Sequence, residues 1–280
     1  FFFKQKTAYE ISTRDWSSDV CSSDLFQDLH ETLGRNHFQA HPTMTDDELG
    51  EAEISRYGDL LVSQEEHREA DEWVGSVLNQ FEPGKSYSVR EFLHLLGREL
   101  AEIAHEDGIL TSAFKARVPV FCPDLLGSEF SIGIARAKFE KKIQTYFDLT
   151  QDTLDMMNIA NRARNSGIIT LGSTASQSMV NVSELSSYIT RTNARGHKYA
   201  ISVTTDAAPL DIRTPSYGGG HTEIFGKLQK GATTAYVQCD PSIALPMVIT
   251  ALSQTAAKFM KGRKRPTFSF GGKELGIDVP

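Results

Sequence analysis

The sequence predicts an α/β fold, a Rossmann-like parallel sheet with helices on both faces, and three observations support this prediction. In the second half of the chain, short β-rich runs alternate with helical patterns, which is the order typical of a parallel sheet. Two of these runs, residues 199–206 and 233–240, each end on an aspartate. A third run ends at Leu171 and is followed directly by Gly172.

Residues 1–25 differ in composition from the rest of the chain, and no regular helix or strand period fits them. The stretch resembles a translated sequencing adapter, so we exclude it from the fold and expect the native amino terminus to be missing. A signal peptide is the alternative, but no apolar stretch of about 7 to 15 residues follows the basic residues. We therefore expect a single domain over residues 26–262 and a tail over residues 263–280.

The first elements of this domain are predicted from apolar spacing and helix-start signals. A helix over residues 26–34 carries its apolar side chains on one face and ends at a glycine. A short strand or turn over residues 54–62 and a helix over residues 64–81 follow. Ser88 and Glu91 form a capping box before a further amphipathic helix.

Beyond Gly108 the pattern changes to strands that alternate with helices. Apolar runs predict strands over residues 118–122, 143–149, 168–171, 199–205 and 233–240, and helical spacing predicts helices over residues 150–164, 177–194 and 242–260. Pro241 at the start of the last helix occupies a position where a missing N–H group costs nothing.

Composition disfavours several classes of protein. The formal net charge of −7 disfavours a general nucleic-acid binder, which needs a basic face to neutralise phosphates. We find no run of about 18 apolar residues and therefore expect no membrane span. Cys122 and Cys239 each lie in an apolar run, which indicates buried thiols in a reducing compartment rather than a disulfide or a metal site. We therefore expect a cytoplasmic protein without a bound metal.

Lys227 is the strongest chemical candidate, because it lies between two predicted parallel strands. Ligands of open α/β sheets bind just beyond the carboxyl ends of the strands. Apolar surroundings would disfavour the charged ammonium group and leave an amine that acts as a nucleophile. The alternative is a surface lysine, which on a helix would pair with Glu223 four residues before it.

Four predicted strands end in residues suited to a ligand at one edge of the sheet. Gly172 would let a cofactor phosphate approach the backbone, and Asp206 and Asp240 would accept hydrogen bonds from ribose hydroxyl groups. The fourth junction follows Cys122. Asp240 is equally suited to cap the helix after it, and Asp206 to form a local turn. The Gly-x-Gly-x-x-Gly fingerprint is absent from the sequence.

Seven short stretches carry a resemblance to a known family. They are Asp28-Leu-His30 with Leu33-Gly34, Glu91-Phe-Leu-His-Leu-Leu-Gly97, Val118-Pro-Val-Phe-Cys-Pro123, Ile168-Ile-Thr-Leu-Gly172, Thr205-Asp-Ala207, Gly226-Lys227 and Asp240-Pro-Ser-Ile-Ala-Leu-Pro246. In this order and spacing they resemble the deoxyhypusine synthase family, and the resemblance extends from Phe26 to about Lys261.

The resemblance implies an NAD-dependent enzyme that oxidises the secondary amine of spermidine and holds the aminobutyl group as an imine on Lys227. The group then passes to a second amine, which is a lysine of a translation factor in the named reaction and a small diamine in related enzymes. The family also implies a homotetramer whose sites lie between subunits. It assigns NAD contacts to Gly172, Thr205, Asp206 and Asp240, and polyamine contacts to Glu129, His221 and Glu223.

Two other functions stay open. The glycine-rich stretch expected after residues 168–171 is reduced to Gly172-Ser-Thr174, which favours a non-catalytic assembly that binds NAD or a polyamine. In such an assembly, Lys227→Ala would leave ligand binding intact. The other alternative is an enzyme that consumes NAD, which release of nicotinamide would reveal.

Overall fold

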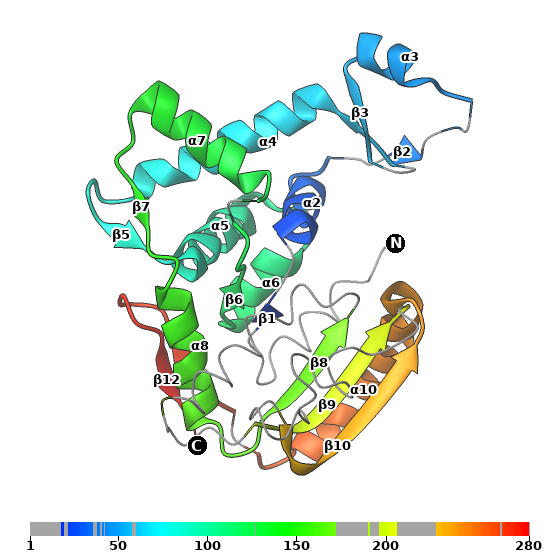
Figure 1. The fold of residues 1–280 in the computed structure, drawn as a ribbon, viewed down its shortest axis with the longest axis vertical. Coiled ribbons are helices and arrows are strands. Elements are labelled where there is room, and N and C mark those ends of the chain that lie inside the picture. The colour runs from blue at the N-terminus through cyan, green and yellow to red at the C-terminus, as the bar shows by residue number, and fades with distance from the viewer. Residues whose placement is uncertain are drawn as a thin grey trace. The chain divides into compact units, whose positions relative to one another are not determined.

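The structure, a computed structural model, describes residues 18–19, 22–35, 38–39, 41, 43–57, 60–125, 127–171, 190, 196–205, 228–263 and 265–279. The chain divides into two compact units, one formed by Val20–Asp148 and the other by Phe1–Asp19 with Leu149–Pro280. The first unit is mainly helical, and the second contains a parallel sheet (Figure 1).

Helices dominate the unit Val20–Asp148. They are α2 (Ser22–Thr32), α3 (Asp46–Glu51), α4 (Gln64–Val77), α5 (Val89–Ile103), α6 (Ile109–Ala116) and α7 (Phe130–Lys141), and a 3-10 turn over Leu78–Gln80 extends α4. The strands are β2 (Phe38–Gln39), β3 (Ile54–Tyr57), β4 (Leu60–Ser63), β5 (Ser86–Tyr87), β6 (Val120–Phe121) and β7 (Tyr146–Phe147). Strands β2, β4 and β3 form a small antiparallel sheet in that order, and β5 pairs with β7 in parallel.

The predicted helices of this unit are confirmed, with some shifted ends. The helix predicted from residue 26 begins at Ser22, and Leu25 is fully buried, so this part of the excluded segment packs into the core. Ser88 and Glu91 form the predicted capping box: Glu91 N–H donates to Ser88 Oγ at 3.1 Å, and Ser88 N–H donates to Glu91 Oε2 at 2.8 Å. The sequence patterns do not predict α6 and α7.

Aromatic side chains fill the centre of the helical unit. Phe92 of α5 is fully buried, and its ring centroid lies 6.1 Å from Phe81, 6.3 Å from Phe130 and 5.6 Å from Phe147 in edge-to-face pairs. Such pairs add to the free energy gained by burying the rings. The apolar run at residues 143–149 was predicted as a strand of the main sheet. It packs into this core instead, and within the run only β7 is a strand.

Two helix pairs in this unit approach closely at glycines. A Cβ atom at Gly97 of α5 would lie 2.5 Å from the carbonyl oxygen of Leu110 in α6. A Cβ atom at Gly133 of α7 would lie 2.7 Å from the carbonyl oxygen of Asp71 in α4. Because interiors are close-packed and both contacts are to backbone atoms, only glycine fits the present helix spacing.

Asp28 of α2 caps helix α6 from a distant part of the sequence. Helix α6 begins after Gly108, and Ile109 N–H donates to Asp28 Oδ2 at 2.7 Å. Burial raises the pKa of Asp28 to about 6, although hydrogen bonds from the backbone of Ile109 and Leu110 act in the opposite direction. The carboxylate therefore replaces the side-chain cap that glycine lacks, at the cost of its own desolvation.

This raised pKa predicts a pH-dependent contribution to stability. Because the pKa of folded Asp28 lies above its ordinary value of 3.8, the folded state binds the proton more tightly than the unfolded state. The contribution is therefore fully present below about pH 4 and is lost as the pH rises through about 6, by up to about 3 kcal/mol. Asp28→Asn should flatten this part of the slope, measured as the free energy of unfolding in urea between about pH 4 and 7.

Asp124→Asn provides the matched control for this measurement. Asp124 is exposed, and its Oδ1 also accepts a backbone N–H, from Gly127 at 3.0 Å. The control should keep the wild-type slope. An Asp28→Asn protein that kept it too would show that Asp28 titrates alike in the folded and unfolded states.

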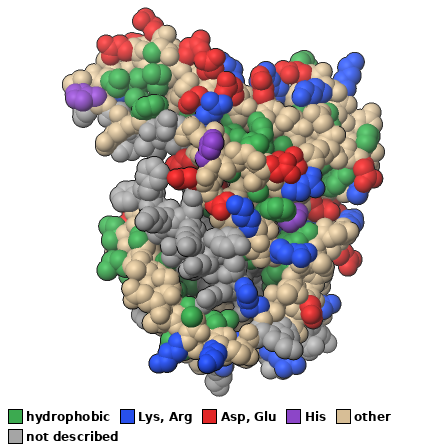
Figure 2. Space-filling model, turned by 180° about the vertical axis from the view of Figure 1, so that it is seen from behind, with side chains coloured by type: hydrophobic (Ala, Val, Ile, Leu, Met, Phe, Trp, Pro, Cys, Tyr) green, Lys and Arg blue, Asp and Glu red, His purple; other side chains and the backbone are tan. Residues whose placement is uncertain are grey.

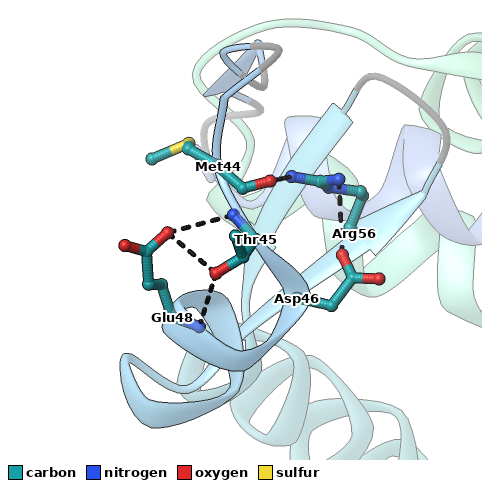
Figure 3. A network of polar contacts seen from close by, with 5 residues as sticks. All are labelled: Met44, Thr45, Asp46, Glu48 and Arg56. Atoms are coloured by element: carbon teal, nitrogen blue, oxygen red, sulfur yellow. Dashed lines mark hydrogen bonds and ion pairs between the residues drawn. The ribbon is translucent and has the colours of Figure 1, made fainter.

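Strands β2, β3 and β4 and helix α3 form a separate part of the helical unit. Acidic side chains gather on its surface (Figure 2). Thr45 begins α3 through a capping box in which Glu48 N–H donates to Thr45 Oγ1 and Thr45 N–H donates to Glu48 Oε2 (Figure 3). Arg56 of β3 donates to the carbonyl oxygen of Met44 at 2.8 Å and pairs with Asp46 at 3.3 Å. Arg56 thus ties the start of α3 to the small sheet.

The unit that contains Leu149–Pro280 is built around a parallel sheet. Its elements are β1 (Ser18–Asp19), α8 (Gln151–Arg162), β8 (Gly167–Leu171), β9 (His197–Thr204), β10 (Leu228–Gln238), α10 (Pro241–Met260), β11 (Thr267–Ser269) and β12 (Gly276–Asp278). Strand β9 lies between β8 and β10, and both pairs are parallel. Helix α10 runs along this sheet (Figure 1). The predicted α/β fold class is confirmed.

Two predicted strands do not join this sheet. The runs at 118–122 and 143–149 shorten to β6 and β7, which lie in the helical unit. Val120, Phe121 and Cys122 are buried there. The prediction that the run ending at Cys122 is a strand of this sheet is therefore wrong, because an apolar run indicates burial but not the sheet to which a strand belongs.

The segment predicted as a tail contains a hairpin. Strands β11 and β12 pair antiparallel, and Phe268 and Leu275 are buried. Leu275 N–H donates to Asp155 Oδ1 at 3.1 Å, and Arg162 Nη1 donates to the carbonyl oxygen of Ile277 at 2.9 Å. Both bonds attach the hairpin to α8.

Helix α10 is long and apolar enough to cross a membrane by the criteria of length and composition alone, contrary to the expectation that the chain has no such segment. Serine and threonine residues interrupt the apolar run of this helix. Thr250 Oγ1 donates to the carbonyl oxygen of Pro246 at 2.7 Å, and Thr255 Oγ1 to that of Ala251 at 2.9 Å, so both hydroxyls are satisfied within the helix. A helix that packs against protein passes the same test, so the finding does not by itself place α10 in a membrane.

Candidate functional site

The parallel sheet brings the carboxyl ends of its strands to one edge. Leu171 of β8 and Val237 of β10 are both in register with Val203 of β9. The ladder continues beyond β10, because Cys239 N–H donates to the carbonyl oxygen of Thr204 at 3.0 Å. Open α/β sheets bind their ligands at this edge.

Asp240 follows β10 at this edge and caps α10. Its Oδ1 accepts a hydrogen bond from Ser242 N–H at 2.8 Å. Hydrogen bonding by Ser242 lowers the pKa of Asp240, so the exposed carboxylate is ionised at neutral pH. Because a carboxylate offers about four acceptor positions, Asp240 can cap the helix and still accept hydrogen bonds from a ligand. The two roles predicted for Asp240 are thus compatible.

Thr205 is the second predicted cofactor residue that the structure places at this edge. It is exposed and lies one residue beyond the end of β9. The other predicted residues of the sheet unit lie outside the described residues; they are Gly172, Asp206, His221, Glu223 and Lys227.

Leu228, which follows Lys227 in the sequence, lies at the opposite edge of the sheet. It pairs with His197 at the amino end of β9, whereas Asp240 follows the carboxyl end of β10. The length of β9, from His197 to Thr204, separates the two edges. At about 3.3 Å per residue this separation is roughly 23 Å, far more than one side chain spans.

Glu129, the predicted polyamine contact, lies in the helical unit directly before α7. Its backbone is already helical, and its half-buried side chain makes no capping hydrogen bond in the described structure. Two serine hydroxyls hold the preceding turn: Ser128 Oγ donates to the carbonyl oxygen of Leu125 at 2.6 Å, and Ser131 Oγ to that of Ser128 at 2.7 Å. These serine hydrogen bonds hold the turn, and the Glu129 carboxylate makes no capping hydrogen bond to its described residues.

Asp71 of α4 is a second carboxylate near Glu129, whose charge raises the pKa of Asp71. The sequence patterns did not indicate Asp71 as a site residue. The residue is 8% exposed, and its Oδ1 has no hydrogen-bond partner among the described residues. Burial raises the pKa of Asp71 to about 6, while the charge of Arg136 lowers it and that of Glu129 raises it. The available signal was spacing, because Asp71 lies three residues before buried Val74 and so shares the apolar face of the helix.

Comparisons with known proteins agree on one family. The family described as "Deoxyhypusine synthase" matches residues 20–252. A protein named "Probable deoxyhypusine synthase 2" from Methanosarcina mazei is 31% identical over 267 residues, which cover 92% of this chain and 73% of that protein. A "Deoxyhypusine synthase-like protein" from Caulobacter vibrioides is 26% identical over 256 residues, which cover 89% of this chain and 68% of that protein.

Solved structures are also similar to this chain. One of them is the crystal structure of a "putative deoxyhypusine synthase" from Entamoeba histolytica, with a TM-score of 0.46 and 14% sequence identity. The match covers 70% of this chain and 57% of that chain, which is less than two thirds of its length.

Proposed function

Because this chain belongs to the deoxyhypusine synthase family of enzymes, we propose that it is an NAD-dependent aminoalkyl transferase. It takes an aminobutyl group from a polyamine such as spermidine and transfers it to a second amine through an imine on Lys227. The observation that carries the proposal is the family match over residues 20–252, which includes Lys227 and all the predicted contact residues.

Lys227 is the proposed nucleophile. Its Nζ must lose a proton before it attacks, and apolar surroundings favour this by destabilising the charged form. The aminobutyl carbon must first be oxidised to the imine level, for which bound NAD would accept the hydride. Nζ then forms a C=N bond to this carbon, and the remainder of the polyamine leaves as an amine. A second amine attacks the same carbon and displaces Lys227, and the new C=N bond would be reduced by return of the hydride.

Residues at the carboxyl edge of the sheet suit NAD. The ionised Asp240 carboxylate is exposed there with acceptor capacity for ribose hydroxyl groups, and Thr205 lies at the same edge. Gly172 and Asp206 are the further proposed contacts. When bound, NAD supplies a hydride acceptor for oxidation of the polyamine and a hydride donor for reduction of the product.

Carboxylates are the proposed partners of the polyamine, because protonated amines make their strongest hydrogen bonds with ionised acceptors. Glu129 and Glu223 supply these carboxylates in the proposal, and His221 offers an imidazole nitrogen as a further acceptor. The acceptor amine is either a protein lysine, such as one on a translation factor, or a small diamine. The net charge of −7 suits such cationic partners better than nucleic acid.

We propose a homotetramer with sites shared between subunits, as the family resemblance implies. Leu228 and Asp240 lie at opposite edges of the sheet, which supports a site in which Lys227 of one copy meets the cofactor edge of another. Helix α10 offers apolar surface for such an assembly, since Ile243 is 60% exposed, Met247 70% and Phe259 65%. We place the assembled enzyme in the cytoplasm.

Trapping the imine tests the proposal. Incubation of the protein with NAD and labelled spermidine, followed by borohydride reduction and peptide mass analysis, should place the label on Lys227 only when NAD is present. Lys198→Ala, which removes an exposed lysine of β9, should label as the wild type does. No adduct across a panel of diamines and triamines would reject the transferase, and retained NAD binding would then favour a non-catalytic assembly.

A further inference from the structure

Asp71 is a buried acid that does not stabilise the described structure through a hydrogen bond to its Oδ1. The residue is 92% buried, from its exposed fraction of 8%, and its Oδ1 has no hydrogen-bond partner among the described residues. A buried carboxylate in this state costs folding free energy, which an apolar side chain at the same position on α4 would not. A ligand that pairs with the charge would remove part of that cost.

The packing of α4 against α7 places Asp71 beside Glu129. A Cβ atom at Gly133 would meet the Asp71 carbonyl oxygen at 2.7 Å, and one at Gly75 would meet the Gly133 carbonyl oxygen at 3.0 Å. The two helices therefore approach most closely at the first turns of α7. Glu129 lies directly before that turn, and its charge raises the pKa of Asp71, an effect smaller than the opposite one of Arg136.

Arg136 lowers the pKa of Asp71 through its charge but makes its ion pairs with other carboxylates. Its Nη2 lies 2.7 Å from Glu72 Oε1 and its Nε lies 2.9 Å from Glu140 Oε1, whereas no ion pair joins it to Asp71 or Glu129 in the described part of the chain. Among these five side chains, one guanidinium group faces four carboxylates. Their summed charge is negative, which favours a cationic ligand.

We propose that Asp71 and Glu129 together bind one protonated amino group of the polyamine. This inference rests on the proposed function, and it adds a specificity-determining residue that the family resemblance does not assign. An ammonium group has three N–H donors, so it can bind both carboxylates at once. Desolvation around Asp71 strengthens such a contact relative to one at an exposed acid.

The test compares Asp71→Asn with Glu72→Gln, its neighbour on α4. Both variants remove one negative charge beside Arg136, but Glu72 already pairs with that arginine. Asp71→Asn should raise the KM for spermidine by about 10- to 100-fold while the KM for NAD changes little, because only the polyamine loses a buried partner. Glu72→Gln should leave both constants within about twofold of the wild type.

Two spermidine analogues, in each of which one terminal amine is replaced by a methyl group, separate recognition from general damage. For one analogue, the wild type and Asp71→Asn should have the same KM, because the amino group that Asp71 binds is already absent. Glu129→Gln should behave in the same way toward that analogue. If Asp71→Asn raised the KM for both analogues equally, or left the KM for spermidine unchanged, the inference would be overturned.

Failure of this inference can be told apart from failure of the proposed function. If the wild-type protein forms the Lys227 adduct but Asp71→Asn retains the wild-type KM, only the two-carboxylate site is wrong. If the wild type forms no adduct, the transferase itself is wrong. Urea unfolding of each variant shows whether the change also affects the fold, and direct calorimetry with spermidine then replaces the kinetic constants for a variant of low activity.

Discussion

Replacement of Gly97 by alanine is expected to lower the free energy of unfolding by about 3 kcal/mol, the upper end of the usual cost of overpacking. The added Cβ would lie 2.5 Å from the carbonyl oxygen of Leu110, 3.1 Å from its carbonyl carbon and 3.3 Å from Phe114 Cβ. Two of these three atoms belong to the backbone of α6, so no rotamer change relieves the clash. Helices α5 and α6 would have to separate, and the core around α5 would lose contacts.

Gly50→Ala is the matched control, because it adds the same methyl group to a helix where the space is open. No atom lies within 4 Å of the position that its Cβ would occupy. Alanine has the higher helix propensity, so this variant should be as stable as the wild type or up to about 1 kcal/mol more stable. Urea denaturation followed by circular dichroism at one fixed protein concentration measures both variants, since assembly makes stability depend on concentration. Equal midpoints for Gly97→Ala and Gly50→Ala would show that α5 and α6 have room to adjust.

Local signals predicted the elements whose causes lie within a few residues. Ser88 and Glu91 each accept a hydrogen bond from the other's backbone N–H group across one helical turn. Four sequence positions were therefore enough to predict the start of α5. The order of strands and helices likewise predicted the parallel arrangement of β8, β9 and β10. The sequence placed Asp240 at a strand end and a helix start, and the structure has it in both positions.

Features that depend on distant contacts were not predictable in this way. The cap of α6 comes from Asp28, 81 residues before Ile109, and only the fold brings them together. The proposed site at Asp71 and Glu129 depends on the packing of α4 against α7, because the two positions lie more than fifty residues apart in the sequence. Spacing along a helix indicates that Asp71 is buried but not which helix buries it.

Loss of Lys227 is expected to abolish the proposed imine and to reduce transfer by more than about 1,000-fold, because the proposal assigns the covalent bond to the aminobutyl carbon to this side chain. Asp240→Ser is the complementary variant. Serine keeps a side-chain cap for α10 but removes the carboxylate proposed to bind ribose, so the KM for NAD should rise by about tenfold or more while the helix stays stable. At a low NAD concentration, each variant alone should show little activity.

Mixing the two variants decides how a site is built. If each site takes Lys227 from one copy and Asp240 from another, a site is complete when an Asp240→Ser copy supplies the lysine and a Lys227→Ala copy supplies the aspartate. With equal amounts and random assembly each condition is met half of the time, so about a quarter of the wild-type activity should return. If both residues of a site came from one chain, every site would carry one defect and no activity would return. The separation of Leu228 from Asp240 across the sheet favours recovery, and its absence after confirmed subunit exchange would refute the shared site.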